Sequence, residues 1–232
     1  MPPATQASQA WLECRAVEIL FADEALVAIN KPAGLSVSPD GWQIDSTYLI
    51  KLMEAEYGRI WTVHRLDKHT SGVLVFARTA DAHRALSLQF ERRQARKLYH
   101  ALANGQPQWD ERTSRQPLRS NVGHKHRAVI DQGRGKPSTT AFRVLERFLA
   151  HVLLEASPLT GRTHQVRVHA SALHLPLLGD SLYGAPATQV IARPALHSLS
   201  LSLVHPKTLL PVTFTAPYPA DFEAALASLR TG

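Results

Sequence analysis

The feature that most constrains the fold of this chain is a series of short apolar stretches. They follow one another in pairs, with few helical stretches between them. Residues 17–21 and 25–30 form one pair, and residues 139–145 and 152–156 form another. Residues 199–203 alternate leucine with serine, which is typical of a strand with one buried face. Strands that are consecutive along the chain pair in antiparallel fashion, whereas parallel strands need a long crossover. The sequence therefore predicts an α+β fold in which helices flank a mainly antiparallel mixed sheet.

Helices are predicted where apolar residues recur every three or four positions. Thr79 is a suitable N-terminal cap for a helix in which Ala82, Leu86 and Phe90 form one face. Other helices are expected to begin after Asp45 or Ser46, near Arg162, and at Pro219 or Asp221. These helices are too few to separate all the strands, which agrees with an antiparallel sheet.

The composition is that of a globular protein. The 232 residues are 44% hydrophobic and 19% charged, which excludes an intrinsically disordered chain. Residues 1–14 lack periodicity and are expected to form a flexible tail, and residues 15–232 a single domain. The single cysteine, Cys14, excludes a disulfide within the chain. With no apolar run long enough for a membrane span and no signal peptide, we expect a cytoplasmic protein.

The positive charge of the chain is concentrated in one segment. Of the formal net charge of +7, residues 112–136 carry +6, from seven basic residues and the one acid Asp131. The basic residues are Arg112, Arg115, Arg119, Lys125, Arg127, Arg134 and Lys136. A solvated surface would explain them, but their concentration in a stretch with little apolar content favours contact with a polyanion. Charge alone does not distinguish RNA, DNA and anionic lipid.

Two polar segments are candidates for a functional site. Residues 64–72 place the acid Asp67 among basic and hydroxyl residues in a loop between apolar stretches, a common location for catalytic groups. An aspartate that closes a turn before Gly72 would give the same pattern. Residues 159–169 lie at the expected start of a helix, where free N–H groups attract anions and Arg162 would reinforce a phosphate site. A helix with an ordinary polar face is the alternative there.

These segments resemble the signature of the RluA-type RNA pseudouridine synthases. The aspartate loop matches as His64-Arg65-Leu66-Asp67 followed by Thr70-Ser71-Gly72. The other motifs occur in the family's order: Lys31-Pro32 with Gly34, Lys97 with Tyr99, the segment from Gly161 to His169, and Gly179-Asp180 through Tyr183-Gly184. The resemblance covers about residues 17–217. Because little sequence precedes Val17, the chain is similar to compact members that lack an extra N-terminal RNA-binding module.

The resemblance implies an enzyme that isomerises uridine in structured RNA to pseudouridine with neither a metal nor an organic cofactor. Asp67 would be the nucleophile, and whether it attacks C1′ of the ribose or C6 of the base stays open. Arg167 would be its charged partner, and Tyr99 the base that removes the C5 proton. Arg65 would fill the space left by the flipped uridine. The further residues expected to bind RNA are Lys31, Arg162 and His164.

The expected partner is a stem-loop of ribosomal RNA, transfer RNA or both, bound by a monomer away from any membrane. Two other hypotheses stay open. One is a non-catalytic RNA-binding protein that retains the fold. The other is a carboxylate-dependent hydrolase of nucleosides or glycosides, which needs a second catalytic acid at a suitable separation. His124 and His126 fit the basic surface better than a metal site.

Overall fold

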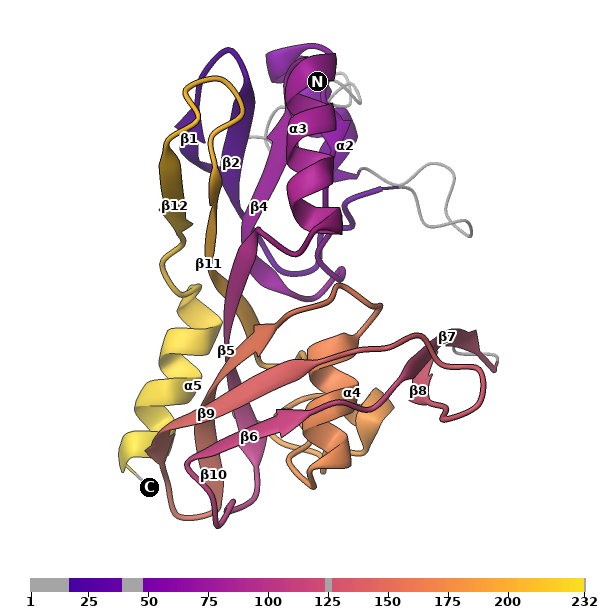
Figure 1. The fold of residues 1–232 in the computed structure, drawn as a ribbon. Coiled ribbons are helices and arrows are strands. Elements are labelled where there is room, and N and C mark those ends of the chain that lie inside the picture. Colours follow the sequence, from indigo (N-terminus) through magenta and orange to yellow (C-terminus); the bar gives the residue numbers. More distant parts are fainter. Residues whose placement is uncertain (1–16, 39–47, 124–126, 232) are drawn as a thin grey trace. The chain divides into compact units, whose positions relative to one another are not determined.

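The computed structural model describes residues 17–38, 48–123 and 127–231 of the chain (Figure 1). The expected tail of residues 1–14 and the helix caps expected at Asp45 or Ser46 lie outside these residues. The chain divides into two compact units. Unit 1 consists of the described residues up to Ala95 and of Ser200–Pro217, and unit 2 of Arg96–Leu199 and the described residues from Tyr218 on.

Unit 1 is built on a set of neighbouring strands. They are β1 (Glu18–Ala22), β2 (Leu26–Lys31), β3 (Trp61–Thr62), β4 (Ser71–Ala77), the C-terminal half of β11 (Leu196–Val204) and β12 (Pro211–Thr215). Their order is β1-β2-β4-β11-β12, and β3 pairs with the end of β4. β2 is antiparallel to β1 and β4, and β12 is antiparallel to β11. Every residue of β4 is buried, as expected for a strand with neighbours on both sides.

The core of unit 1 follows from the apolar pattern of its elements. Leu201 and Leu203 of β11 are buried, whereas the serines between and before them are partly exposed. Helix α3 (Ala80–Glu91) packs Ala82 and Leu86 into the same core. It begins after Thr79, whose Oγ1 accepts a hydrogen bond from the Ala82 N–H at 3.1 Å. The predicted cap and apolar face of this helix are confirmed.

Unit 2 holds a second antiparallel group of strands and a separate hairpin. β5 (Arg96–Asn104), β10 (His151–Pro158), β9 (Thr140–Arg147) and β6 (Glu111–Ser114) lie side by side in this order, with the N-terminal half of β11 next to β5. β7 (Leu118–Val122) and β8 (Arg127–Ile130) form a two-stranded sheet of their own. The helical elements are α4 (Gln165–Ala172), the 3₁₀ turn η1 (Ser181–Tyr183) and α5 (Ala220–Thr231).

The antiparallel strand pairs in both units confirm the predicted α+β fold with a mainly antiparallel sheet. Three details differ from expectation. Helix α2 (Leu49–Tyr57) begins after Tyr48, and α4 begins at Gln165 rather than near Arg162. The strands of the basic segment, β6, β7 and β8, were not predicted, because this segment is polar and has no apolar alternation. No helix in the described part of the chain has the length and apolar character that crossing a bilayer requires.

Candidate active site

The Asp67 loop, residues 64–70, joins β3 to the buried strand β4. Leu66 is buried and anchors the middle of the loop, whereas Asp67 is partly buried and the neighbouring Arg65 is exposed. The Thr70 N–H donates to the carbonyl oxygen of Asp67 at 3.0 Å and closes a turn around the aspartate. The loop therefore holds the Asp67 backbone in a turn and leaves Arg65 at the surface.

His64 fixes the first end of this loop. The backbone N–H of Val75 donates to His64 Nε2 at 3.0 Å, so this ring nitrogen carries no proton. The imidazole also stacks on Phe90 of α3, with ring centroids 4.6 Å apart. These contacts tie the loop to a strand and a helix of unit 1, which gives the first residue of the family motif a supporting role.

Lys31 contacts the Asp67 loop at Lys68. It is fully buried, and its Nζ donates to the carbonyl oxygens of Pro32, Leu35 and Lys68 at 2.7, 2.9 and 3.1 Å. The Gly34 N–H donates to the same Lys68 oxygen at 2.8 Å. The expected contact of Lys31 with RNA stays a prediction, but a buried ammonium group bonded to three carbonyls points first to support of the loop. Its contacts hold the loop residue that follows Asp67.

Gly72 ends the loop with a backbone that favours glycine. Its φ of +108° lies in the region that L side chains rarely adopt. Gly72 pairs with Lys31 across β2 and β4, so the end of the Asp67 loop and the buried lysine are in register. The glycine of the motif is explained by this backbone conformation.

In unit 2, Lys97 and Tyr99 lie two residues apart on β5 and so project to the same face of the strand. Tyr99 is buried and lies opposite Ala156 of β10. Lys97 Nζ donates to the carbonyl oxygen of Thr160 at 3.0 Å, and burial lowers the pKa of this lysine from 10.5 to about 8. The lysine thus ties the strand that carries Tyr99 to the segment before α4.

The lowered pKa of Lys97 predicts a pH dependence of stability. Between about pH 8 and pH 10.5 the unfolded chain still binds the Lys97 proton while the folded chain releases it, so stability should rise with pH across this range. Urea unfolding of the wild type and of Lys97→Met should show that this rise is absent in the variant. Lys51→Met, which removes an exposed lysine of α2, is the control and should keep the rise. Parallel profiles for wild type and Lys97→Met would contradict the prediction.

Arg167 is held in place by Asp180. Its Nε and Nη2 atoms donate to the two carboxylate oxygens, both at 2.7 Å, and both side chains are buried. The guanidinium also lies over the ring of Tyr183, 5.0 Å from its centroid. Gly179, with φ +72°, precedes Asp180, and a Cβ there would collide with the carbonyl oxygen of Arg193. A bidentate partner on a constrained turn fixes the plane of the Arg167 guanidinium.

The turn before α4 is organised by Gln165. Its side-chain oxygen accepts from the Thr160 hydroxyl at 2.7 Å and from the Arg162 N–H at 3.0 Å. His164 follows in the left-handed region, with φ +53°, and its Nδ1 lies 2.8 Å from the Tyr183 hydroxyl. Among the described residues, the buried Nε of Arg162 has no hydrogen-bond partner. The Arg162 side chain as a whole is only partly buried, so it lies where it could meet an anion at this turn.

The comparisons with known proteins agree with these features. Residues 25–172 match the RNA pseudouridylate synthase family. The chain belongs to this family. It is 38% identical to ribosomal large subunit pseudouridine synthase D of Neisseria meningitidis, over 94% of this chain and 62% of that protein. It is 39% identical to an uncharacterized RNA pseudouridine synthase of Synechocystis, over 92% of this chain and 69% of that protein.

A solved structure of a family protein has the same fold. Human RNA pseudouridylate synthase domain containing 4 matches with a TM-score of 0.80 and 26% identity, over 97% of this chain and 98% of that one. The chain spans about three fifths of the length of the Neisseria relative.

The structure distributes the site residues of this family member over both units. Asp67 and Arg65 belong to unit 1, and Tyr99, Arg162, His164 and Arg167 to unit 2. Within unit 2 it brings Arg167 and His164 together around Tyr183. Sequence reasoning did not assign roles to Asp180 and Tyr183, although both belong to the last family motif. The match to the family motif from Gly179 to Gly184 was the available signal, but the contacts of Asp180 and Tyr183 are set by the fold. Among the described residues, no group of three His, Cys, Asp or Glu side chains could hold a metal ion.

Proposed function

We propose that this chain converts uridine to pseudouridine in RNA, with large-subunit ribosomal RNA as a substrate. The observation that carries the proposal is the Asp67 loop. It retains the complete family motif, and its conformation is fixed by His64, Lys31 and Gly72. The names of the Neisseria relative and of the human structure support the reaction and the substrate class.

The isomerisation breaks the N1–C1′ bond of the uridine and forms a C5–C1′ bond. C5 loses a proton and N1 gains one, so nothing is oxidised and nothing is hydrolysed. Asp67 is proposed to act as the nucleophile that holds the intermediate while the uracil turns, a role that carboxylates take in glycosyl chemistry. Its position in a fixed turn supports this role, because a nucleophile that is already oriented reacts faster than one on a mobile loop.

The other site residues have proposed roles that complement that of Asp67. Arg65 is exposed beside it, which supports insertion of its planar guanidinium into the space that the flipped uridine leaves. Tyr99 is proposed to take the C5 proton. Arg167 is proposed to be the charged partner of Asp67, and the bidentate contact with Asp180 supports a fixed orientation for it. Arg162 and His164 are proposed to meet the RNA backbone at the turn before α4.

The basic segment is the proposed RNA-binding surface. In its described part, Arg112, Arg115, Arg127, Arg134 and Lys136 are exposed on and around β6, β7 and β8. Arg119 pairs with Asp131 at 2.8 Å. Asp131 also accepts from the backbone N–H groups of Gly133 and Arg134, which hold its pKa below the usual range. The single acid of the segment is therefore occupied locally, and the remaining positive charges are available to phosphates.

Loss of these charges should reduce the salt dependence of RNA binding. In the variant with Arg115, Arg127 and Arg134 all changed to Gln, the slope of log K against log salt should fall by about 0.7–0.9 for each lost phosphate contact. Binding of transcribed large-subunit ribosomal RNA, measured from low to moderate salt, gives the slope. A control variant changes Lys51, Arg84 and Arg230, on the helices α2, α3 and α5, to Gln and removes the same charge. Equal slopes for the two triple variants would mean that the basic segment is only solvated.

Three finer points complete the proposal. A stem-loop of transfer RNA is proposed as a second substrate, because the RluA-type enzymes that the chain resembles act on ribosomal RNA, transfer RNA or both. The protein is proposed to act as a monomer, and in the cytoplasm, where bacterial ribosomal RNA is made and assembled. The name of the Neisseria relative supports only the ribosomal substrate.

The experiment that tests the function is direct. Purified protein is incubated with large-subunit ribosomal RNA transcribed with tritium at uridine C5. Release of tritium, together with mapping of the pseudouridines formed, would support the proposal. RNA binding without tritium release would favour a non-catalytic RNA-binding protein, and release of free uracil would favour a hydrolase.

A further inference from the structure

The basic hairpin of β7 and β8 depends on α4 and η1 for its attachment. It is not part of the larger sheet, and its small apolar cluster consists of Leu118, Ala128 and Val168, with Ile130 and Tyr183 packed against them. Val168 belongs to α4 and Tyr183 to η1. The hairpin therefore keeps its position through residues of the family's last two motifs.

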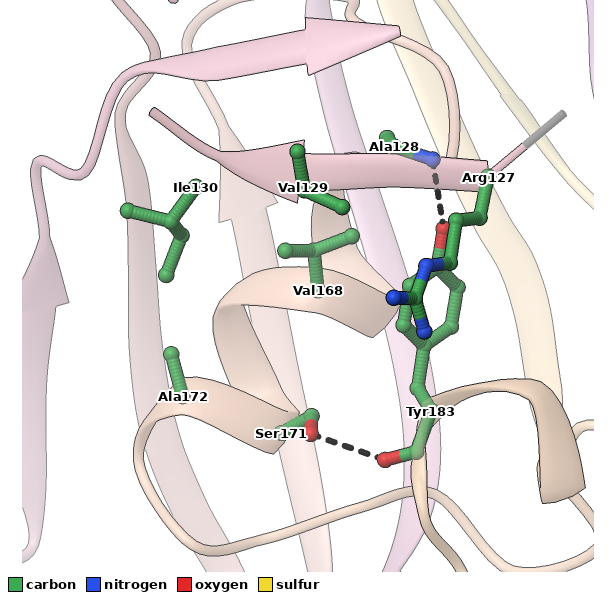
Figure 2. A pocket seen from close by; sticks show the side chains of 8 residues that line it. All are labelled: Arg127, Ala128, Val129, Ile130, Val168, Ser171, Ala172 and Tyr183. Carbon is green, nitrogen blue, oxygen red and sulfur yellow. Dashed lines mark hydrogen bonds between the residues drawn. The ribbon is translucent and has the colours of Figure 1, made fainter. Parts of the chain in front are cut away.

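A bulge in the hairpin directs one backbone donor to Tyr183. Arg119 pairs with Val129 and Val122 pairs with Arg127, so two residues of β7 lie opposite the single residue Ala128 of β8. Ala128 is fully buried. Its N–H donates to the Tyr183 hydroxyl at 3.0 Å instead of to β7 (Figure 2).

The same hydroxyl reaches the N-terminus of α4. The Tyr183 oxygen accepts the Ala128 N–H, and the same hydroxyl is hydrogen-bonded to His164 Nδ1, 2.8 Å away. His164 is the residue in the left-handed region directly before α4. One hydroxyl group thus links the basic hairpin to the turn that carries Arg162 and His164.

The ring of Tyr183 contacts Arg167. The guanidinium lies 5.0 Å from the ring centroid, and the Tyr183 N–H donates to the carbonyl oxygen of Asp180 at 3.1 Å. Asp180 holds the same guanidinium through both carboxylate oxygens. In addition, the Ser171 hydroxyl donates to the Tyr183 carbonyl oxygen at 2.8 Å (Figure 2). Arg167 is therefore held between two residues of one short turn, and one of them also holds the hairpin.

We propose that Tyr183 is a positioning residue that couples RNA bound on the β7–β8 hairpin to the orientation of Arg167 and His164. The inference rests on the proposed function, and it adds a residue whose hydroxyl acts through others rather than on the uridine. If Tyr183 were needed only for packing, its replacement by phenylalanine would not lower the reaction rate, because the ring and its contact with Arg167 remain. If Tyr183 couples the hairpin to Arg167 and His164, the same replacement should lower the rate, because both hydrogen bonds of the hydroxyl disappear.

The test is Tyr183→Phe, with the single-turnover rate of tritium release measured at saturating large-subunit ribosomal RNA. The rate should fall about tenfold, the effect expected from losing two ordinary hydrogen bonds. Tyr218→Phe is the matched control, because Tyr218 also hydrogen-bonds a histidine of unit 2, His100. Its rate should stay within about twofold of wild type. A folded Tyr183→Phe variant with the wild-type rate would overturn the proposal.

A double-mutant cycle tests the coupling itself. Arg127→Gln removes an exposed charge next to Ala128 and should lower the rate at saturating RNA in the wild type but not further in Tyr183→Phe. Additive effects would overturn the proposal, whereas an inactive wild type would count against the proposed function alone. Backbone amide hydrogen exchange tests the coupling even if the wild type is inactive. Binding of RNA should slow the exchange of residues 162–168 in the wild type but not in Tyr183→Phe. Equal protection in both proteins would overturn the coupling whether or not the protein is active.

Discussion

Replacing Asp67 with asparagine is expected to abolish pseudouridine formation while RNA binding and folding persist. The amide has nearly the same shape as the carboxylate, but it is neutral and a poor nucleophile. The loop should keep its conformation, because its fixed contacts involve the Asp67 carbonyl oxygen, His64 and Lys31 rather than the carboxylate alone. Phosphate contacts provide much of a protein's affinity for nucleic acid, and the proposed ones lie on the basic segment. The single-turnover rate of tritium release should fall by about 10⁴-fold or more, the scale seen when a nucleophile is removed.

Three measurements make this prediction decisive. The dissociation constant for the ribosomal RNA should stay within about threefold of wild type, and the thermal unfolding midpoint within a few degrees. Asp81→Asn is the matched control, since Asp81 is an exposed aspartate of unit 1 in the first turn of α3. It should leave the rate unchanged. Tritium release by Asp67→Asn at more than a trace of the wild-type rate would refute the nucleophile role.

The sheet was predictable where burial leaves a pattern in the sequence. The alternation of leucine and serine in β11 and the apolar stretch of β4 reflect one-sided and two-sided burial. The Thr79 cap was predictable for a similar reason, because its hydrogen bond is local. The β7–β8 hairpin was not predictable from the sequence, because the apolar residues that pack against it, Val168 and Tyr183, lie far along the chain.

The site was predictable as a set of motifs, but not as a set of contacts. Asp67 and its loop could be located because the family motif is contiguous. Lys31 was expected to bind RNA because it belongs to the family motif of Lys31, Pro32 and Gly34. Its burial becomes possible only when three carbonyls of the folded loop surround the ammonium group. Asp180 was not assigned a partner, because its pairing with Arg167 depends on how the turn after Gly179 meets α4.

Replacing Tyr99 with phenylalanine is expected to lower turnover by about 10²–10⁴-fold, the usual contribution of a general base. The substitution keeps the buried ring on β5 and removes only the hydroxyl. RNA affinity should therefore stay close to wild type, and the loss should lie in the rate at saturating RNA. Tyr218→Phe again controls for the removal of a tyrosine hydroxyl in unit 2.

The position of the tritium label tells which step Tyr99 serves. Tritium leaves C5 only after the uracil has turned and the new C5–C1′ bond has formed, so a variant that lacks the base should retain the label. A tyrosine in water has a pKa of about 10 and is a weak base at neutral pH. To act as the base, the Tyr99 hydroxyl must give up its own proton as it takes the one from C5. A rate of tritium release that depends on the hydroxyl would support this path. If Tyr99→Phe releases tritium within a few-fold of wild type, the ring is a stacking platform for the uracil, and the proton leaves through water or through Asp67.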